Sequence, residues 1–234
     1  TETTPIGRKL LQAHVDDDHT PDAHLITEET SAPLKTAIKA AQQRNVQLVV
    51  LDEHAPELFG EGLRGDAADR MRKKTSCDVV TVTSARSGSE ISSVLVAVAE
   101  GKHSGLGVVV GGALAVGSNA VVDLFHVSRD KDDAEISRVS ELFETSRARL
   151  PESVELETWH LEAPDVAEAI SNESTHYDVT VIGNPTQSRL REFVTGSIDR
   201  LSREEAFEVA ATLIYAMNGT AGRLEGEDEF TGDS

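Results

Sequence analysis

Cysteine is almost absent from this sequence, with Cys77 the single one among 234 residues. One cysteine excludes an internal disulfide and is typical of a reducing compartment, so we predict a cytoplasmic protein. Residues 1–24 also lack the apolar core of a signal peptide. The chain begins with Thr1 rather than Met, which leaves two alternatives open: a trimmed start, or a piece of a longer protein.

Basic residues are few as well, because 22 Lys and Arg stand against 41 Asp and Glu, a formal net charge of -19. This balance argues against nucleic acid partners, whose binding depends on neutralised phosphates, and disfavours anionic membrane surfaces. The acids are spread along the chain, as suits a protein that stays soluble in concentrated salt. A halophilic source is the favoured explanation, and an ordinary acidic bacterial protein is the alternative.

The motifs of common catalytic and metal centres are missing. The sequence contains no Gly-x-Ser-x-Gly and no Walker lysine motif. Its eight His have no ligand-type spacing, so we expect them on the solvated surface. Asp16–Asp18 lacks the glycine and the distal Glu of a calcium loop. We therefore predict no enzymatic activity and no metal site.

What the sequence does contain is an alternation of strands and helices, which is typical of parallel sheets built from crossovers. Residues 104–122 carry no charge but hold five glycines between two strands, so a buried crossover helix is favoured over a membrane span. The expected strands are 24–28, 47–51, 79–83, 94–98, 121–127, 154–160, 179–182 and 209–215. The expected helices are 33–44, 66–74, 103–119, 134–150, 163–171 and one after Gly196.

The sequence also repeats itself. A shift of 131 residues places Ala32-Pro33 on Ala163-Pro164, Leu48–Leu51 on Val179–Ile182 and Gly65 on Gly196. A nearly constant offset across strand and helix indicates a duplication. The first copy lacks the opening strand–helix–strand that 94–127 provides in the second.

The last part of the second copy contains a pattern that is typical of phosphate-binding loops. The buried strand Val179–Ile182 ends at Gly183, and Gly196-Ser197 follows after a polar loop. Glycines at the end of a strand let the backbone approach a ligand, and the next helix offers N–H groups to an anion.

On these residues, the segment 92–217 resembles a universal stress protein domain. The segment 8–85 has a weaker resemblance to the same kind of domain. The resemblance implies an α/β fold of the adenine nucleotide alpha hydrolase type, a doubly wound five-stranded parallel sheet that often binds ATP at its switch point. The family motif is Gly, two residues, Gly, nine residues, Gly, then Ser or Thr. Gly183, Thr186, Gly196 and Ser197 keep its spacing but lack its second glycine.

The resemblance also implies the site residues. His126-Val127 matches the end of the family's second strand, and Ala99 replaces the Asp that normally ends its first strand. ATP with Mg²⁺, or AMP, is the implied ligand, although none is required. In the first copy, Asp52 and Asp66 replace Gly183 and Ser197 and would repel a polyanion. The predicted nucleotide site comprises Val98, Ala99, Val127, Gly183, Asn184, Thr186, Gly196 and Ser197.

Two tandem copies, with the first truncated, give the predicted domains: a degenerate half at 1–85, a linker at 86–91, the complete domain at 92–218 and an acidic tail at 219–234. The copies are expected to pair through their last strands, 79–83 and 209–215, or the chain to form a homodimer. We predict a non-catalytic stress-response or regulatory module that binds an adenine nucleotide in its second half. The alternative is a nucleotide-independent cytosolic regulatory or dimerisation domain of an amino-acid or ion transporter, partnered by its membrane domain. Slow ATP hydrolysis is a third option without a visible base.

Overall fold

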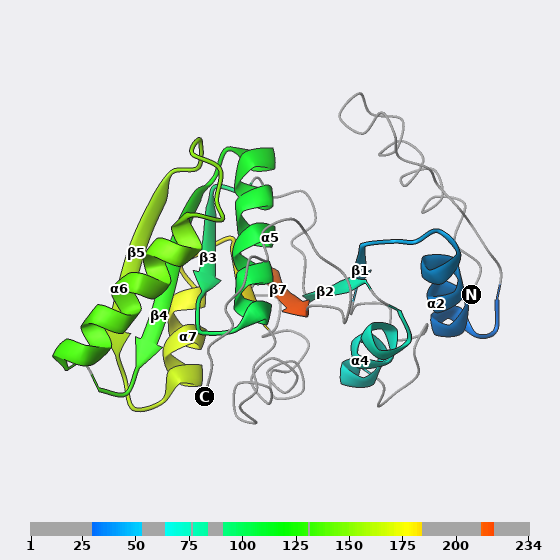
Figure 1. The fold of residues 1–234 in the computed structure, drawn as a ribbon, viewed down its shortest axis with the longest axis horizontal. Helices are drawn as coiled ribbons and strands as arrows, with labels where there is room; N and C mark the ends of the chain where they lie inside the picture. Colours follow the sequence, from blue (N-terminus) through cyan, green and yellow to red (C-terminus); the bar gives the residue numbers. More distant parts are fainter. Residues whose placement is uncertain are drawn as a thin grey trace.

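The computed structural model describes residues 30–52, 64–75, 77–83, 91–130, 132–183 and 212–217 (Figure 1). Within them strands alternate with helices except where β3 follows β2 and where β7 follows β6. The predicted strand 24–28, the helix after Gly196 and the acidic tail lie outside these residues. The strands are β1 (Leu48–Asp52), β2 (Asp78–Thr83), β3 (Ser93–Ala97), β4 (Val121–Ser128), β5 (Leu156–Glu162), β6 (Val179–Gly183) and β7 (Thr212–Met217). The helices are α2 (Pro33–Gln43), α4 (Arg64–Lys74), α5 (Lys102–Ser118), α6 (Asp133–Arg147) and α7 (Val166–Ser174).

All seven strands form one sheet in the order β1-β2-β7-β6-β3-β4-β5. The five strands from β7 to β5 are mutually parallel, which confirms the predicted five-stranded parallel sheet. From β3 the chain proceeds outward to β4 and β5, then returns across β3 to β6 and β7. The direction of winding therefore reverses between β3 and β6, and this is the switch point of the sheet.

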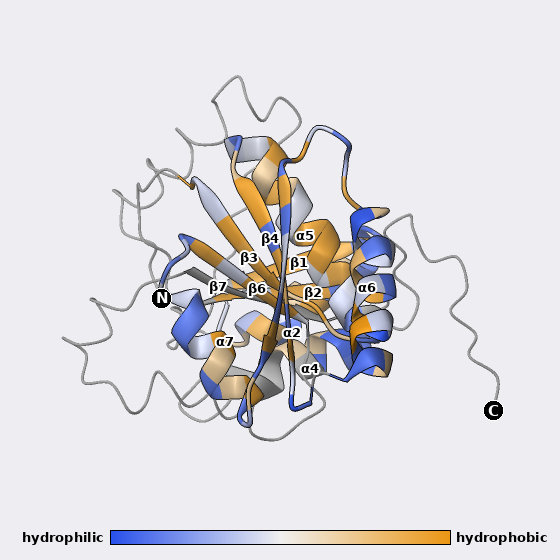
Figure 2. Ribbon diagram, turned by 90° about the vertical axis from the view of Figure 1, so that its left-hand side faces the viewer, coloured by the Kyte–Doolittle hydropathy of each residue, from blue (hydrophilic) through white to orange (hydrophobic). Residues whose placement is uncertain are grey.

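Apolar side chains on the two faces of the sheet make separate cores, because successive residues of a strand point to opposite sides. Val94 and Val96 of β3 pack with α5 and α6, whereas Leu95 and Ala97 pack with α7. Both faces are thus covered, as in a doubly wound fold. Figure 2 shows mainly hydrophobic strands between helices, with many hydrophilic residues on α6. A third cluster joins α2 and α4 to β1 and β2.

The uncharged segment forms α5, which packs on β3, β6 and β7 as the predicted crossover helix. No helix among the described residues has both the length and the apolar character needed to cross a bilayer. Gly111 allows the close packing, since a Cβ there would lie 2.5 Å from Val96 Cγ2.

Two predicted elements are displaced. The strand expected at 154–160 is β5, two residues later, and it is a largely exposed edge strand rather than a half-buried one. The helix expected from Ala163 starts at Val166, because the Asp165 side chain accepts hydrogen bonds from the N–H groups of Ala167 and Glu168. Asp165 is therefore the N-cap, and Pro164 lies outside the helix.

The expected pairing of last strands is present within the chain. β2 runs antiparallel to β7, with Thr81 opposite Tyr215. β7 is described from Thr212 to Met217, so this strand continues two residues beyond the predicted end at Tyr215. The parallel pair β1–β2 therefore lies beside the parallel pair β6–β7 in the sheet, and the two pairs run in opposite directions. The division into a truncated copy at 1–85 and a complete one at 92–218 stays a prediction.

Candidate functional site

A pocket of about 900 Å³ opens at the switch point, over the carboxyl ends of β3, β4 and β6. This is where ligands bind in open α/β sheets, because strands turning away on either side leave a crevice. The pocket floor includes Ala97 and Ile182, and its walls come from the segments that follow β3 and β4 and from the first turns of α6.

Four of the predicted site residues line this pocket: Val98, Ala99, Val127 and Gly183. Three different strand ends supply them, so the fold brings together positions far apart in the sequence. The other four predicted residues lie outside the described part of the chain: Asn184, Thr186, Gly196 and Ser197.

Gly183, the first glycine of the predicted phosphate motif, has a structural role as well. A Cβ at this position would lie 2.7 Å from the carbonyl carbon and oxygen of His103 and from the nitrogen of Ser104. Real Cβ atoms do not approach backbone so closely, so any side chain would push the first turn of α5 away from β6. The glycine is thus required by packing whether or not an anion binds beside it.

The turn between β3 and α5 forms one wall of the pocket. Ala99 is exposed there, and its N–H donates to the buried Ser104 Oγ at 2.9 Å. Gly101 precedes the helix with φ of 111°, a conformation that side chains disfavour. The hydroxyl of Ser104 therefore holds the turn in place from inside α5.

His126 contradicts the expectation that the histidines lie on the surface, because only 7% of it is exposed. It lies near the carboxyl end of β4, and its ring nitrogens face protein atoms. Nδ1 lies 2.8 Å from the carbonyl oxygen of Val98, and Nε2 lies 3.6 Å from Glu135 Oε1. Burial is tolerated because Nδ1 has a hydrogen-bond partner and Nε2 faces the Glu135 carboxylate.

Glu135 belongs to a charged network at the start of α6. Arg138 donates from Nε to Oε2 at 2.8 Å and from Nη2 to Oε1 at 2.6 Å, and its Nη1 donates to Glu100. These hydrogen bonds lower the pKa of Glu135 and raise that of Arg138. The Asp132 side chain accepts from the N–H of Glu135 at 2.8 Å and so caps the helix.

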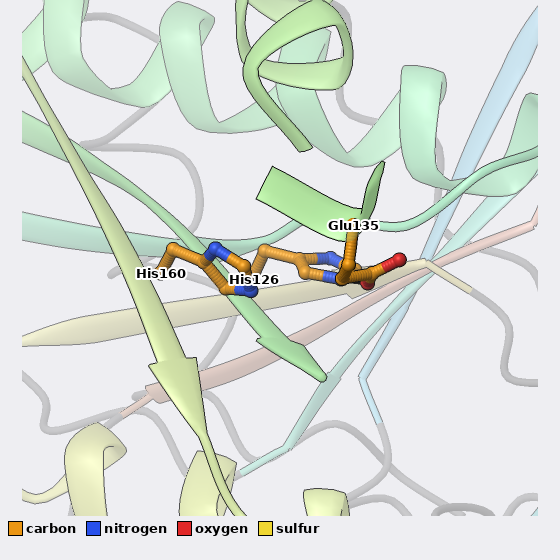
Figure 3. Close-up of side chains that lie close together, drawn as sticks. All are labelled: His126, Glu135 and His160. Atoms are coloured by element: carbon orange, nitrogen blue, oxygen red, sulfur yellow. Dashed lines mark ion pairs between the residues drawn. The ribbon is translucent and has the colours of Figure 1, made fainter. Parts of the chain in front are cut away.

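His160 completes a group that sequence reasoning missed. It is the register partner of His126 in the β4–β5 ladder, and its Nε2 lies 2.7 Å from Ser128 Oγ. One ligand atom from each of His126, Glu135 and His160 lies within 4.8 Å of the others. Figure 3 shows the His126 ring between His160 and Glu135. The available signal was that two predicted strands, 121–127 and 154–160, both carry a histidine near their carboxyl ends.

Comparison of the sequence with family models gives no match, and no curated protein matches it either. Among solved structures, a universal stress protein from Archaeoglobus fulgidus DSM 4304 is 16% identical, with a TM-score of 0.52 over 94% of this chain and 78% of that one. The chain has the universal stress protein fold.

Two further similar structures have lower scores. One is a universal stress protein in complex with cAMP, 17% identical with a TM-score of 0.40, covering 54% of this chain and 97% of that one. The other, from Pseudomonas aeruginosa UCBPP-PA14, is described as a putative universal stress protein. It is 15% identical with a TM-score of 0.46, covering 89% of this chain and 77% of that one.

Proposed function

We propose that this chain is a non-catalytic regulatory module of the universal stress protein type that binds an adenine nucleotide in the switch-point pocket. The observation that carries the proposal is the convergence of Val98, Ala99, Val127 and Gly183 on that one pocket. The family resemblance implies these residues as parts of one site, and three separate strand ends bring them to one pocket. The pocket therefore lies where the resemblance places the nucleotide.

The pocket has the chemistry that a nucleoside requires. Its volume of about 900 Å³ lies at the upper end of the range typical of small-molecule sites. Apolar side chains of Phe125, Val127, Val166 and Ile170 offer a surface for a base. The N–H groups of Val98 and Ala99 already donate within the protein, so the carbonyl oxygen of Ala99 is the backbone group there that can accept an orienting hydrogen bond. The α5 N-terminus follows directly after this turn.

The charge of the pocket sets a limit on affinity. Glu100, Asp130, Asp132 and Glu135 line it together with Arg129 and Arg138, and Arg138 is already paired with two of these acids. A polyanion such as ATP therefore meets repulsion that AMP or cAMP would meet less. We expect weak binding of ATP unless a cation accompanies it, and a preference for nucleotides with fewer charges.

An Ala99→Asp variant tests the proposal by restoring the family's usual residue at the end of β3. A hydrogen bond from a ligand to a carboxylate contributes about 1.5–3 kcal/mol. The variant should therefore bind about ten- to a hundredfold more tightly than the native chain. Isothermal titration calorimetry with AMP, ATP and cAMP in high salt measures this. Ala113→Asp is the matched control, because Ala113 is exposed on α5 outside the pocket.

The outcomes separate the two functions considered for this chain. Tighter binding in Ala99→Asp but not in Ala113→Asp supports a nucleotide site at this pocket. An Ala99→Trp variant, which fills the same wall, should lose the binding. Absence of heat from every nucleotide, in the native chain and in Ala99→Asp alike, contradicts the proposal and favours a nucleotide-independent regulatory domain.

A further inference from the structure

We propose that His126, Glu135 and His160 form a binding site for a divalent transition-metal ion, and that Zn²⁺ is the ion this donor set fits best. The site adjoins the nucleotide pocket, since His126 and Glu135 also line it. The proposal stands independently of whether a nucleotide binds, because it rests on three side chains and their partners.

The spacing of the donors is close to that of a zinc centre. Tetrahedral Zn²⁺ with bonds of about 2.0–2.1 Å holds its ligand atoms about 3.3 Å apart. His126 Nε2 and Glu135 Oε1 are already 3.6 Å apart, and all three donors lie within 4.8 Å of one another. Rotations of the side chains that shorten the distances between ligand atoms by up to about 1.5 Å would therefore close the site.

His126 is oriented as a metal ligand. A backbone carbonyl can only accept a hydrogen bond, so the contact with Val98 places the proton of the neutral ring on Nδ1. The lone pair of Nε2 then points toward Glu135. A hydrogen bond from the far nitrogen to a carbonyl is the arrangement that fixes the ring of most metal-binding histidines. In this chain the register of β3 against β4 places the Val98 carbonyl beside His126 Nδ1.

His160 is held on the same side of the sheet, because it is the register partner of His126. The centres of the two rings are 5.6 Å apart, and the rings are tilted by 59°, so they do not stack face to face. Ser128 Oγ lies 2.7 Å from His160 Nε2. Coordination through Nδ1 would keep this hydrogen bond as an orienting contact, and coordination through Nε2 would replace it.

The charges around the site favour a cation. Arg138 bridges Glu100 and Glu135, so these three side chains together carry one net negative charge. Asp130 and Asp132 add two negative charges to the same pocket and Arg129 adds one positive charge, so these six side chains together carry two net negative charges. Metal binding takes Glu135 Oε1 from Arg138 Nη2, while Oε2 keeps its hydrogen bond from Arg138 Nε. The carboxylate therefore stays anchored when it ligates.

The donor types favour a divalent transition-metal ion over Ca²⁺ and Mg²⁺. Two imidazoles and one carboxylate suit Zn²⁺, whereas Ca²⁺ and Mg²⁺ require shells of oxygen atoms. Three protein ligands leave a fourth tetrahedral position for water or another small ligand. Because two of the three ligands line the pocket, that position would face the pocket.

The test is Zn²⁺ binding by the whole chain, after chelator treatment, in equilibrium dialysis against buffered free Zn²⁺. Excess Mg²⁺ is included to occupy the many surface carboxylates. The variants are His160→Asn and Glu135→Gln, because neither side chain is fully buried. His176→Asn is the matched control, since His176 is exposed and lies near the end of the strands opposite the pocket. Circular dichroism verifies that each variant is folded.

We expect one Zn²⁺ per chain in the native protein and in His176→Asn. Loss of an outer partner of a metal ligand costs 10- to 100-fold in affinity, so loss of a ligand should cost about a hundredfold or more. Bound Co²⁺ should give the visible absorption of a four-coordinate ion in the native chain and lose it in both variants. Equal Zn²⁺ binding by His160→Asn, Glu135→Gln and the native chain, or no stoichiometric binding by the native chain, overturns the proposal.

Discussion

At the scale of single residues, one carboxylate fixes the starts of two neighbouring strands. Asp178 Oδ2 accepts hydrogen bonds from the N–H and hydroxyl groups of Ser92 and Ser93, at 2.7–3.1 Å. Asp178 precedes β6, and the two serines lie at the start of β3. These contacts, first the N–H of Ser92 and then its hydroxyl, lower the pKa of Asp178. The residue joins the two central strands at the end opposite the pocket.

An Asp178→Asn variant should lose about 1–2 kcal/mol of the free energy of unfolding at neutral pH, because the amide accepts these bonds less strongly. A lowered folded-state pKa adds stability that is fully present above the ordinary aspartate pKa of about 3.9 and is lost as pH falls through the folded value. The difference between native and variant should therefore shrink below about pH 4.

Urea denaturation at a series of pH values measures this difference. Asp130→Asn is the control, because Asp130 is exposed and lines the pocket at the other end of the strands. A native–variant difference that persists unchanged in acid would contradict the assigned role.

At the scale of elements, α5 depends on small residues where it crosses the sheet. Its Gly111 faces the fully buried Val96 of β3, and a Cβ there would lie 2.5 Å from Val96 Cγ2. Gly107, one turn earlier, has ordinary van der Waals distances to its neighbours: a Cβ would lie 3.5 Å from Gly183 N and 3.6 Å from Val181 Cγ1. The two positions therefore differ in the space available to a methyl group.

Gly111→Ala should reduce the free energy of unfolding, because overpacking costs about 1–3 kcal/mol and exceeds the gain in helix propensity of about 1 kcal/mol. Gly107→Ala should be neutral or stabilising by up to about 1 kcal/mol, because it gains the propensity without the clash. Thermal and urea denaturation of the two variants give the comparison. Equal effects at both positions would show that the close approach of α5 to β3 is not what Gly111 provides.

At the scale of the whole molecule, acidic charge accumulates over the entire chain. The formal net charge of -19 includes exposed residues outside the lining of the switch-point pocket, such as Glu141 and Glu152. Self-repulsion on this scale destabilises a compact state, and dissolved salt screens it. Stability should therefore depend on ionic strength even where individual ion pairs are weak.

The free energy of unfolding should rise by about 1 kcal/mol or more between low and high NaCl, since the Debye length falls from about 30 Å at 0.01 M to about 3 Å at 1 M. Urea denaturation at several salt concentrations measures the rise. A Glu141→Lys, Glu152→Lys double variant should be more stable than the native chain at low salt and respond less to added salt. Stability that falls with salt would contradict net repulsion.

The sequence alone determined the order and kind of the elements in the described part of the chain. Valine-, leucine- and isoleucine-rich runs bounded by turn residues predicted β1, β3, β4 and β6 within one or two residues. Strands β3, β4 and β6 are largely buried, as such runs indicate, whereas β1 is an edge strand whose Val50 is exposed. The glycine content of residues 104–122 distinguished a crossover helix from a membrane span, and the structure confirms the helix. The pattern at β5 misplaced the strand because an exposed edge strand has no core face to fix its alternation.

Tertiary structure decided which distant residues meet. No spacing in the sequence links His126 to His160, because the register of β4 against β5 makes them partners, and α6 then brings Glu135 to them. Likewise, the requirement for glycine at position 183 comes from the backbone of α5, eighty residues earlier. Local sequence fixes φ, ψ and periodicity, but the contacts between strand ends depend on sheet order and register, which arise only when the whole sheet assembles.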